Sequence, residues 1–292
     1  MGNLAFKRWT IGDVRVTRIL EGDAHRVDWP HLYADGSPEL AARHAWLQPH
    51  YVNAQGQILL ALQAFVVESA GRRILVDTCV GNGRERDIPA CHMMQTAFLE
   101  DLDKAGFAPE LIDTVLCTHL HFDHVGWNTH WADGCWQPTF LNARYLFGRR
   151  EWDHWRGLHE EQGEPWPAHI VDSVLPILDA GLADFVEDDH LITEEVWLEP
   201  TPGHTPGHVS LHIASAGRHA VITGDVIHNP VELAEPHLHK IACSDAEQSR
   251  LTRLRFAETY ENRQALVFGT HFGGPTAGWI LRDGTAWRFA EE

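Results

Sequence analysis

The chain has 292 residues, of which 44% are apolar and 10% aromatic, enough to bury a substantial core. Its 23 basic and 41 acidic residues give a formal net charge of −18 with histidine counted as neutral. A field of that sign repels phosphate backbones and anionic membranes, so nucleic acids and membrane surfaces are not expected as partners.

Short apolar and β-branched runs predict strands, and segments with a helical spacing of apolar residues lie between them. In chain order we expect strands at Val14–Leu20, Leu59–Val67, Arg73–Val76, Thr114–Cys117, Arg144–Phe147, Val196–Leu198, His208–Ile213, His219–Ile222 and Ala265–Phe268. Helices are expected at Thr96–Ala105, Arg150–Leu158 and Asp245–Asn262, the last with Ser244 as its N-cap. This order predicts an α/β layered architecture of mixed sheets with helices outside.

We expect residues 1–292 to form a single domain, because no stretch has the composition of a linker. The segment Gly22–Gln57 fits neither a helix nor a strand, yet it is rich in aromatic residues. We interpret residues 22–57 as an N-terminal insertion or cap loop that either covers the core, borders a binding site or contacts a second subunit.

The five cysteines are scattered and never spaced as C-x-x-C, which argues against a disulfide framework and against a thiolate zinc knuckle. The sequence does not open with an apolar segment of signal-peptide length and has no apolar run of about 18 residues, so a cytoplasmic enzyme is expected. The chain also contains 21 histidines, the commonest metal-ligating residue.

The strongest local pattern is the run His119-Leu-His121-Phe-Asp123-His124, which follows the predicted strand Thr114–Cys117 directly. His119 and His121 are two residues apart, so an extended chain points both to the same side. Several imidazoles and a carboxylate this close are difficult to explain as packing, whereas a divalent metal ion holds them together in the neutral state. The run therefore predicts a metal site.

Further candidate ligands follow other predicted strands. His204 lies in the turn Gly203-His-Thr-Pro-Gly-His208, Asp225 follows His219–Ile222, and His271 follows Ala265–Phe268. Loops at one edge of a sheet converge, so residues after several strands can complete one site.

These patterns, HxHxDH, GHTPGH, GD and a late TH in that order, resemble the metal motifs of the metallo-β-lactamase superfamily over roughly Ile74 to Phe272. The resemblance implies an αββα sandwich of two mixed β-sheets with outer helices. It also implies that His119, His121 and His204 bind one metal, that Asp123, His124 and His271 bind a second, and that Asp225 bridges both. Asp77 would then orient a ligand histidine from behind.

His121 stands where redox relatives of the superfamily carry an acid, and His124 and His271 are both present, so we expect a dinuclear hydrolytic site. Zinc is the first choice for mixed imidazole and carboxylate ligands, and iron, manganese or cobalt also suit them. Two metals about 3.5–4 Å apart would share a water and convert it to a bridging hydroxide nucleophile. Asp123 would carry a proton to the leaving group.

Within the superfamily, the stretch Gly224-Asp-Val-Ile-His228-Asn-Pro is similar to the methyl-parathion-hydrolase-like and lactonase-like branch. Lactonases of the acyl-homoserine type often carry a tyrosine soon after the bridging aspartate, and here only His228 lies near. His228 is therefore interpreted as a catalytic oxyanion donor or proton carrier, or else as a residue that supports the site from outside. Either a substrate pocket or the core would explain the apolar residues flanking the ligand loops, Trp127, Trp131, Met93, Met94 and Phe272.

The expected function is hydrolysis of a small, mostly apolar lactone or ester, with an aryl phosphotriester as a side activity. A glyoxalase II-like thioester hydrolase would use the same ligands, and a non-catalytic metal-binding or sensor protein is the alternative from another class. The expected partner is a small-molecule substrate, and a homodimer is compatible with the aromatic N-terminal segment.

Overall fold

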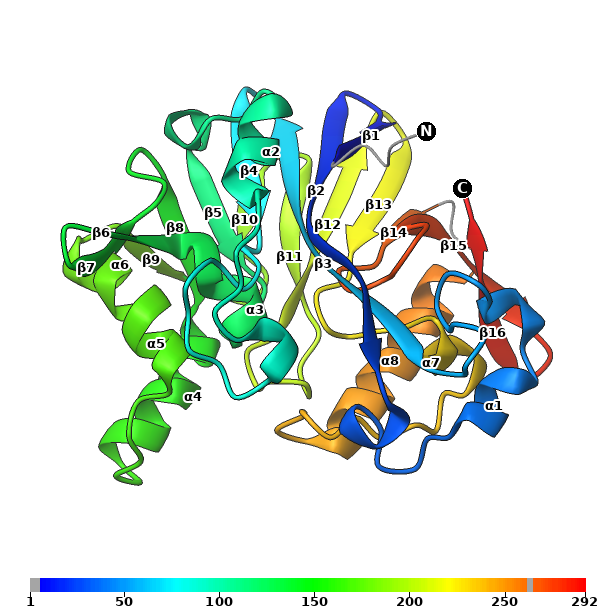
Figure 1. Cartoon of the computed structure of the whole chain (residues 1–292). Helices are drawn as coiled ribbons and strands as arrows, with labels where there is room; N and C mark the ends of the chain where they lie inside the picture. The colour runs from blue at the N-terminus through cyan, green and yellow to red at the C-terminus, as the bar shows by residue number, and fades with distance from the viewer. Residues whose placement is uncertain (1–5, 262–264) are drawn as a thin grey trace.

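A computed structural model describes residues 6–261 and 265–292, in which two mixed β-sheets pack face to face (Figure 1). The first sheet has the order β1-β2-β3-β4-β5-β8-β9. Its strands are β1 Phe6–Ile11, β2 Val14–Val27, β3 Ile58–Ser69, β4 Arg72–Val76, β5 Thr114–Cys117, β8 Arg144–Gly148 and β9 Ala183–Val186. Strands β1 to β4 are antiparallel, whereas β4, β5, β8 and β9 run parallel.

The second sheet is formed by the C-terminal half of the chain, in the order β10 to β16. Its strands are β10 Leu191–Thr193, β11 Val196–Pro200, β12 Val209–Ser215, β13 Arg218–Ile222, β14 Ala265–Phe268, β15 Ala277–Asp283 and β16 Ala286–Glu291. Only β13 and β14 are parallel in this sheet. A separate hairpin pairs β6 Thr129–Ala132 with β7 Cys135–Pro138.

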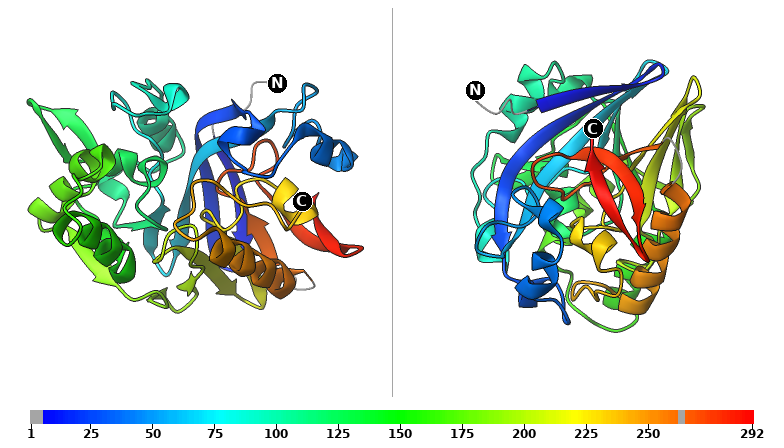
Figure 2. Two further views of the ribbon diagram at one scale, coloured as in Figure 1. Left: turned by 90° about the horizontal axis from the view of Figure 1, so that it is seen from below. Right: turned by 90° about the vertical axis from the view of Figure 1, so that its right-hand side faces the viewer.

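The helices lie either against the outer faces of the two sheets or in the loops between strands. They are α1 Pro38–Ala42, α2 Phe98–Lys104, α3 Phe122–Val125, α4 Arg149–Glu160, α5 Ala168–Ser173, α6 Leu175–Asp179, α7 Val231–Ala234 and α8 Ala246–Tyr260. Figures 1 and 2 show α4 and α5 on one side of the molecule and α8 on the other. None of the helices in the described part of the chain has the length and apolar character needed to cross a membrane.

Successive side chains of a strand point to opposite faces of its sheet, so each strand contributes both to the core between the sheets and to the core under the outer helices. In β4, Ile74 and Val76 pack in the core between the sheets, while Leu75 faces the outer helices. In β13, Ile222 faces the inner core and Val221 faces α8. Each sheet therefore buries both faces, and the predicted αββα sandwich is confirmed.

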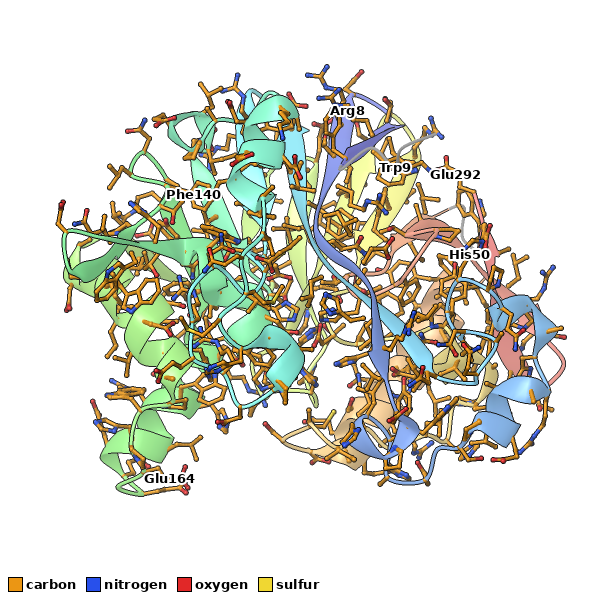
Figure 3. All side chains as sticks on the ribbon, viewed as in Figure 1. Arg8, Trp9, His50, Phe140, Glu164 and Glu292 are labelled. Atoms are coloured by element: carbon orange, nitrogen blue, oxygen red, sulfur yellow. The ribbon has the colours of Figure 1, made fainter. Side chains whose placement is uncertain are left out.

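Side chains fill the space between the layers, as Figure 3 shows. Phe140 is fully buried beside β8, where its ring contacts Tyr145. Glu164, by contrast, lies exposed at the tip of the segment that follows α4.

The predicted strands correspond to β2, β3, β4, β5, β8, β11, β12, β13 and β14. The predicted helices correspond to α2, α4 and α8, but the N-cap of α8 is Asp245, whose carboxylate accepts a hydrogen bond from the amide of Gln248, and not Ser244. The helix ends at Tyr260, and Asn262 lies outside the described residues.

The segment 22–57 is not a loop throughout. Gly22–Val27 continues β2 past a register shift, and the remainder contains α1 and two single 3-10 turns. Its aromatic side chains Trp29, Tyr33 and Tyr51 are almost fully buried in the core cluster under α7 and α8. The segment therefore covers the second sheet at the end where the candidate ligands lie.

Candidate metal centre

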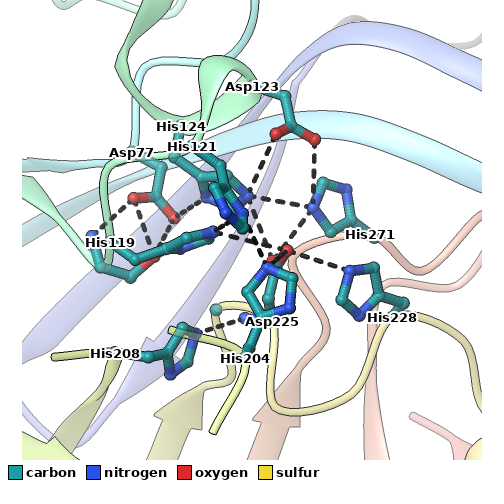
Figure 4. Close-up of polar contacts among 12 residues, drawn as sticks. Asp77, His119, His121, Asp123, His124, His204, His208, Asp225, His228 and His271 are labelled. Atoms are coloured by element: carbon teal, nitrogen blue, oxygen red, sulfur yellow. Dashed lines mark hydrogen bonds and ion pairs between the residues drawn. The ribbon is translucent and has the colours of Figure 1, made fainter. Parts of the chain in front are cut away.

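The ends of four strands bring the predicted ligands together (Figure 4). The chain leaves β5 at Cys117 and places His119 and His121 before the short helix α3, which contains Asp123 and His124. His204 comes from the turn between β11 and β12, Asp225 follows β13, and His271 follows β14. Both sheets thus contribute residues to a single site.

Four of these residues form one group of potential ligand atoms: His119, His121, His204 and Asp225. His121 Nδ1 lies 3.0 Å from His119 Nε2 and 2.9 Å from His204 Nε2. Three imidazole nitrogens that face one another at such distances fit a shared cation, because three N–H groups could not point inward together.

The second group comprises Asp123, His124 and His271. His271 Nε2 lies 3.2 Å from His124 Nε2 and 3.7 Å from Asp123 Oδ2. Among the described residues, these are the two groups of three or more histidine, cysteine or acidic side chains with ligand atoms within 4.8 Å of one another.

Asp225 lies between the two groups, with one carboxylate oxygen directed toward each (Figure 4). Oδ2 is 3.2 Å from His204 Nε2, whereas Oδ1 is 3.1 Å from His271 Nε2 and 3.2 Å from His124 Nε2. Oδ1 is buried and has no hydrogen bond of good geometry within the described residues. A carboxylate in this position fits a bridge between two cations.

The buried site shifts the pKa values of its members in opposite directions. Burial lowers the pKa of His119 and of His204 well below the usual value, which favours the neutral, metal-binding imidazole. Burial alone would lower the pKa of His124 as well, but the carboxylates of Asp225, Asp77 and Asp123 raise it. Burial would raise the pKa of Asp225, yet the surrounding histidines hold it well below its usual range. The buried carboxylates therefore favour positive charge in this site, an environment that also suits divalent cations.

Contacts behind the candidate ligands fix their rings, as metal-ligating histidines require. His124 Nδ1 lies 2.9 Å from Asp77 Oδ2, and Asp77 Oδ1 accepts a hydrogen bond from the amide of Thr118. His271 Nδ1 lies 2.9 Å from the carbonyl oxygen of Ala61. Asp77 thus lies where we expected an orienting residue.

Two positioning residues were not predicted from the sequence. Glu151 of α4 is 1% exposed, and its carboxylate accepts hydrogen bonds from the amides of Leu120 and Gly207, which belong to two different ligand loops. His208 accepts a hydrogen bond from the amide of Asp225 at 2.7 Å. Gly224, at φ +54°, leaves room for that ring, since a Cβ there would lie 2.6 Å from His208 Nε2.

His228 reaches the same site from the loop after β13. Its Nε2 lies 3.1 Å from Asp225 Oδ2, and its ring stacks on that of His271 with 20° between the planes. It belongs to neither group of candidate ligands. His228 therefore lies beside the Asp225 carboxylate without belonging to either group.

The apolar residues predicted to line a pocket lie in three different parts of the structure. Met93, Trp127 and Trp131 line a pocket of about 840 Å³ together with Trp136 and Val171. Met94 packs beside Phe122 against a small buried cluster.

Phe272 is fully buried in the core against Tyr51 and Phe289, so we assign it to the core and not to a pocket. None of the candidate ligands is among the residues that line the 840 Å³ pocket. The substrate-pocket role of Met93, Met94, Trp127 and Trp131 stays a prediction.

Comparison with known proteins connects this geometry to a family. The family model described as "Metallo-beta-lactamase superfamily" matches residues 60–271. An N-acyl homoserine lactonase of Bacillus sp is 32% identical over 112 residues, which are 38% of this chain and 37% of the relative. The match thus spans little more than a third of that relative's length.

Solved structures resemble the whole chain. The structure of a hydrolase, AbOPH, in the beta lactamase superfamily has a TM-score of 0.83 at 22% identity, covering 100% of this chain and 99% of the other. The structure of AidC, a dizinc quorum-quenching lactonase, has a TM-score of 0.80 at 20% identity, covering 99% and 97%. At these identities the likeness establishes the fold.

Proposed function

The chain belongs to the metallo-beta-lactamase superfamily, and from this premise we propose that it is a dinuclear metal-dependent hydrolase that opens a small, mostly apolar lactone or ester. The position of Asp225 carries the proposal, with one carboxylate oxygen facing each of two groups of imidazoles. His119, His121 and His204 would hold one ion, and Asp123, His124 and His271 the other.

The donor set fits zinc, because neutral imidazoles and carboxylates are its usual ligands outside cysteine sites. Iron, manganese and cobalt share this preference for nitrogen and oxygen donors. When bound, two such ions supply an activated water and polarise the reacting oxygen of the substrate.

The chain's own residues would perform the remaining steps. The Asp123 side chain is 18% exposed and lies at the edge of its group, where it can accept a proton and return it to the leaving group. His228 lies on the opposite side of Asp225, where a side-chain N–H can stabilise the charge that develops on the substrate oxygen.

A lactone is the first substrate to test, because relatives with 32% and 31% identity over 112 residues are N-acyl homoserine lactonases. A chain with a net charge of −18 favours neutral substrates over anions, which agrees with an apolar lactone or ester. An aryl phosphotriester is also neutral and would be a side activity.

A glyoxalase II-like thioester hydrolase is the second candidate, because it would use the same ligands. Glutathione thioesters are anionic, so the net charge of −18 disfavours them. A protein that binds metal as a sensor without turnover is the alternative from another class.

Metal analysis of the purified protein, combined with a screen of lactones, aryl esters, thioesters and phosphotriesters, tests the proposal. We expect about two divalent ions per chain and highest kcat/KM on a lactone or ester. Preference for a thioester would favour the second candidate. Two bound ions without turnover on any class would favour the sensor, and full turnover without metal would contradict the mechanism.

A further inference from the structure

A buried lysine stands directly behind His228. Lys240, in the loop between α7 and α8, is only 3% exposed, and its Nζ lies 3.1 Å from His228 Nδ1. The same ammonium group donates to the carbonyl oxygen of Asp225 at 2.5 Å and lies 3.3 Å from that of Val226. It therefore contacts both the loop that carries the central carboxylate and the imidazole that faces it.

A buried carboxylate, that of Glu232 in α7, lies beside this lysine. The carboxylate is completely buried, with Oε2 3.7 Å from Lys240 Nζ and 2.9 Å from Arg253 Nη1. Its Oε1 accepts hydrogen bonds from the Tyr33 hydroxyl and from the amide of His228. A buried cation is tolerated when a carboxylate and carbonyl oxygens surround it, and one carboxylate and two carbonyl oxygens lie near the Lys240 ammonium group here.

A charged ammonium group has three N–H donors and no lone pair, so it can only donate. His228 Nδ1 must then be an acceptor, and the proton of the neutral ring lies on Nε2. The other candidate for Nδ1, Glu232 Oε1, is 4.0 Å away and already accepts three hydrogen bonds, the third from the amide of Asn229. Nε2 is the atom that lies 3.1 Å from Asp225 Oδ2, on the side of the metal centre.

We propose that Lys240 is a positioning residue that fixes His228 as the neutral tautomer with its proton on Nε2, so that His228 presents a hydrogen-bond donor to the metal centre and does not act as a proton acceptor there. The catalytic consequence rests on the proposed hydrolase function, whereas the tautomer itself does not. The spacing of sequence motifs gives no sign of Lys240, because it acts through a contact across two loops.

The tautomer can be measured without substrate. In zinc-loaded protein labelled with ¹⁵N-histidine, two-bond ¹H–¹⁵N correlation spectra distinguish protonated from unprotonated ring nitrogens, and the His228→Gln variant identifies the His228 signals. We expect an unprotonated Nδ1 and a protonated Nε2. A proton on Nδ1, or an Nε2 without a proton, would overturn the proposal even if no variant of Lys240 folds.

Variants then test the role of Lys240. In Lys240→Met, the fraction of His228 with its proton on Nε2 should fall. Because a hydrogen-bond donor to the transition state is then lost, kcat on the best substrate should fall about 10- to 100-fold, while KM stays within about twofold. Lys240→Arg, which retains a donor, should recover part of kcat. Lys104→Met, on the exposed side of α2, is the matched control and should match the wild-type protein in both measurements.

The two proposals fail in different ways. An unchanged tautomer in folded Lys240→Met would refute the role of Lys240 while leaving the hydrolase intact. Absence of turnover on every substrate class, with the expected tautomer present and dependent on Lys240, would instead refute the proposed function alone.

Discussion

Asp225 is the residue whose side chain faces both groups of candidate ligands. Its two oxygens face His204 on one side and His124 and His271 on the other, and its amide is held by His208. A neutral side chain of the same shape would turn an N–H donor toward one group of imidazoles and would remove the negative charge that the proposed cations require.

Asp225→Asn should therefore lower both bound metal and hydrolysis by orders of magnitude, and His121→Ala should do the same by removing an imidazole from the first group. Metal content by elemental analysis and kcat/KM by substrate assay measure the two effects. Asp133→Asn, at the exposed tip of the β6–β7 hairpin, is the matched control. Normal metal content in Asp225→Asn would show that the carboxylate is not a ligand.

His228→Ala should separate catalysis from metal binding. The ring lies beside Asp225 but outside both groups of ligand atoms, so the metal content should remain that of the wild-type protein. Loss of a single donor to the reacting oxygen lowers kcat by roughly 100- to 1,000-fold. If metal is lost in proportion to activity, His228 is a ligand or a structural residue instead.

At the level of residues, sequence reasoning found the side chains that repeat at short spacing or follow a strand. Four of the candidate ligands lie within six residues of the chain, His119, His121, Asp123 and His124. The structure brings them together with His204, Asp225 and His271. Glu151 and Lys240 could not be found in this way, because a single charged residue among other charged residues forms no spacing pattern that indicates a site. Their role arises only when separate loops are brought into contact.

At the level of elements, α4 links the two ligand loops through Glu151. Its carboxylate accepts hydrogen bonds from Leu120, which lies between His119 and His121, and from Gly207, three residues after His204, as well as from the indole of Trp155. The geometry of the first metal group thus depends on a helix that contributes no ligand.

Glu151→Gln should lower metal affinity about 10- to 100-fold, the usual cost of losing a residue that orients ligands. An amide presents N–H donors where the carboxylate accepted hydrogen bonds, so the free energy of unfolding should also fall by about 1–3 kcal/mol. Zinc titration and chemical denaturation measure these quantities. Glu160→Gln, at the exposed end of the same helix, should change neither. Unchanged zinc affinity in Glu151→Gln would show that the loops hold their own positions.

Four of the strands that sequence reasoning missed share a physical cause. β1, β9, β10 and β16 carry charged residues or are short, and they belong to the outer strands of their sheets, where only part of each strand is buried. β15 contains a glycine and ends in charged residues. The central strands β4, β5, β13 and β14 bury both faces, so their continuous apolar runs predicted them correctly.

At the scale of the whole molecule, the candidate metal centre joins the two sheets. His119, His121, Asp123 and His124 follow a strand of the first sheet, whereas His204, Asp225 and His271 follow strands of the second. A cation bound by both sets would link the two sheets at the strand ends that carry these residues. We therefore expect removal of metal to lower the stability of the whole sandwich as well as catalysis.

Metal removal should lower the melting temperature. A ligand that binds only the folded state, at a free concentration about 1,000 times its Kd, stabilises that state by about 4 kcal/mol. In a chain of this size such a change corresponds to roughly 5 to 10 °C. Calorimetry of zinc-loaded protein and of protein treated with a chelator measures the difference. Asp225→Asn, in which the link between the two groups is broken, should show a much smaller response to zinc. If the chelated protein melts at the same temperature as the zinc-loaded form, the hydrophobic core alone holds the two sheets together. Bound metal would then contribute nothing to the stability of the fold.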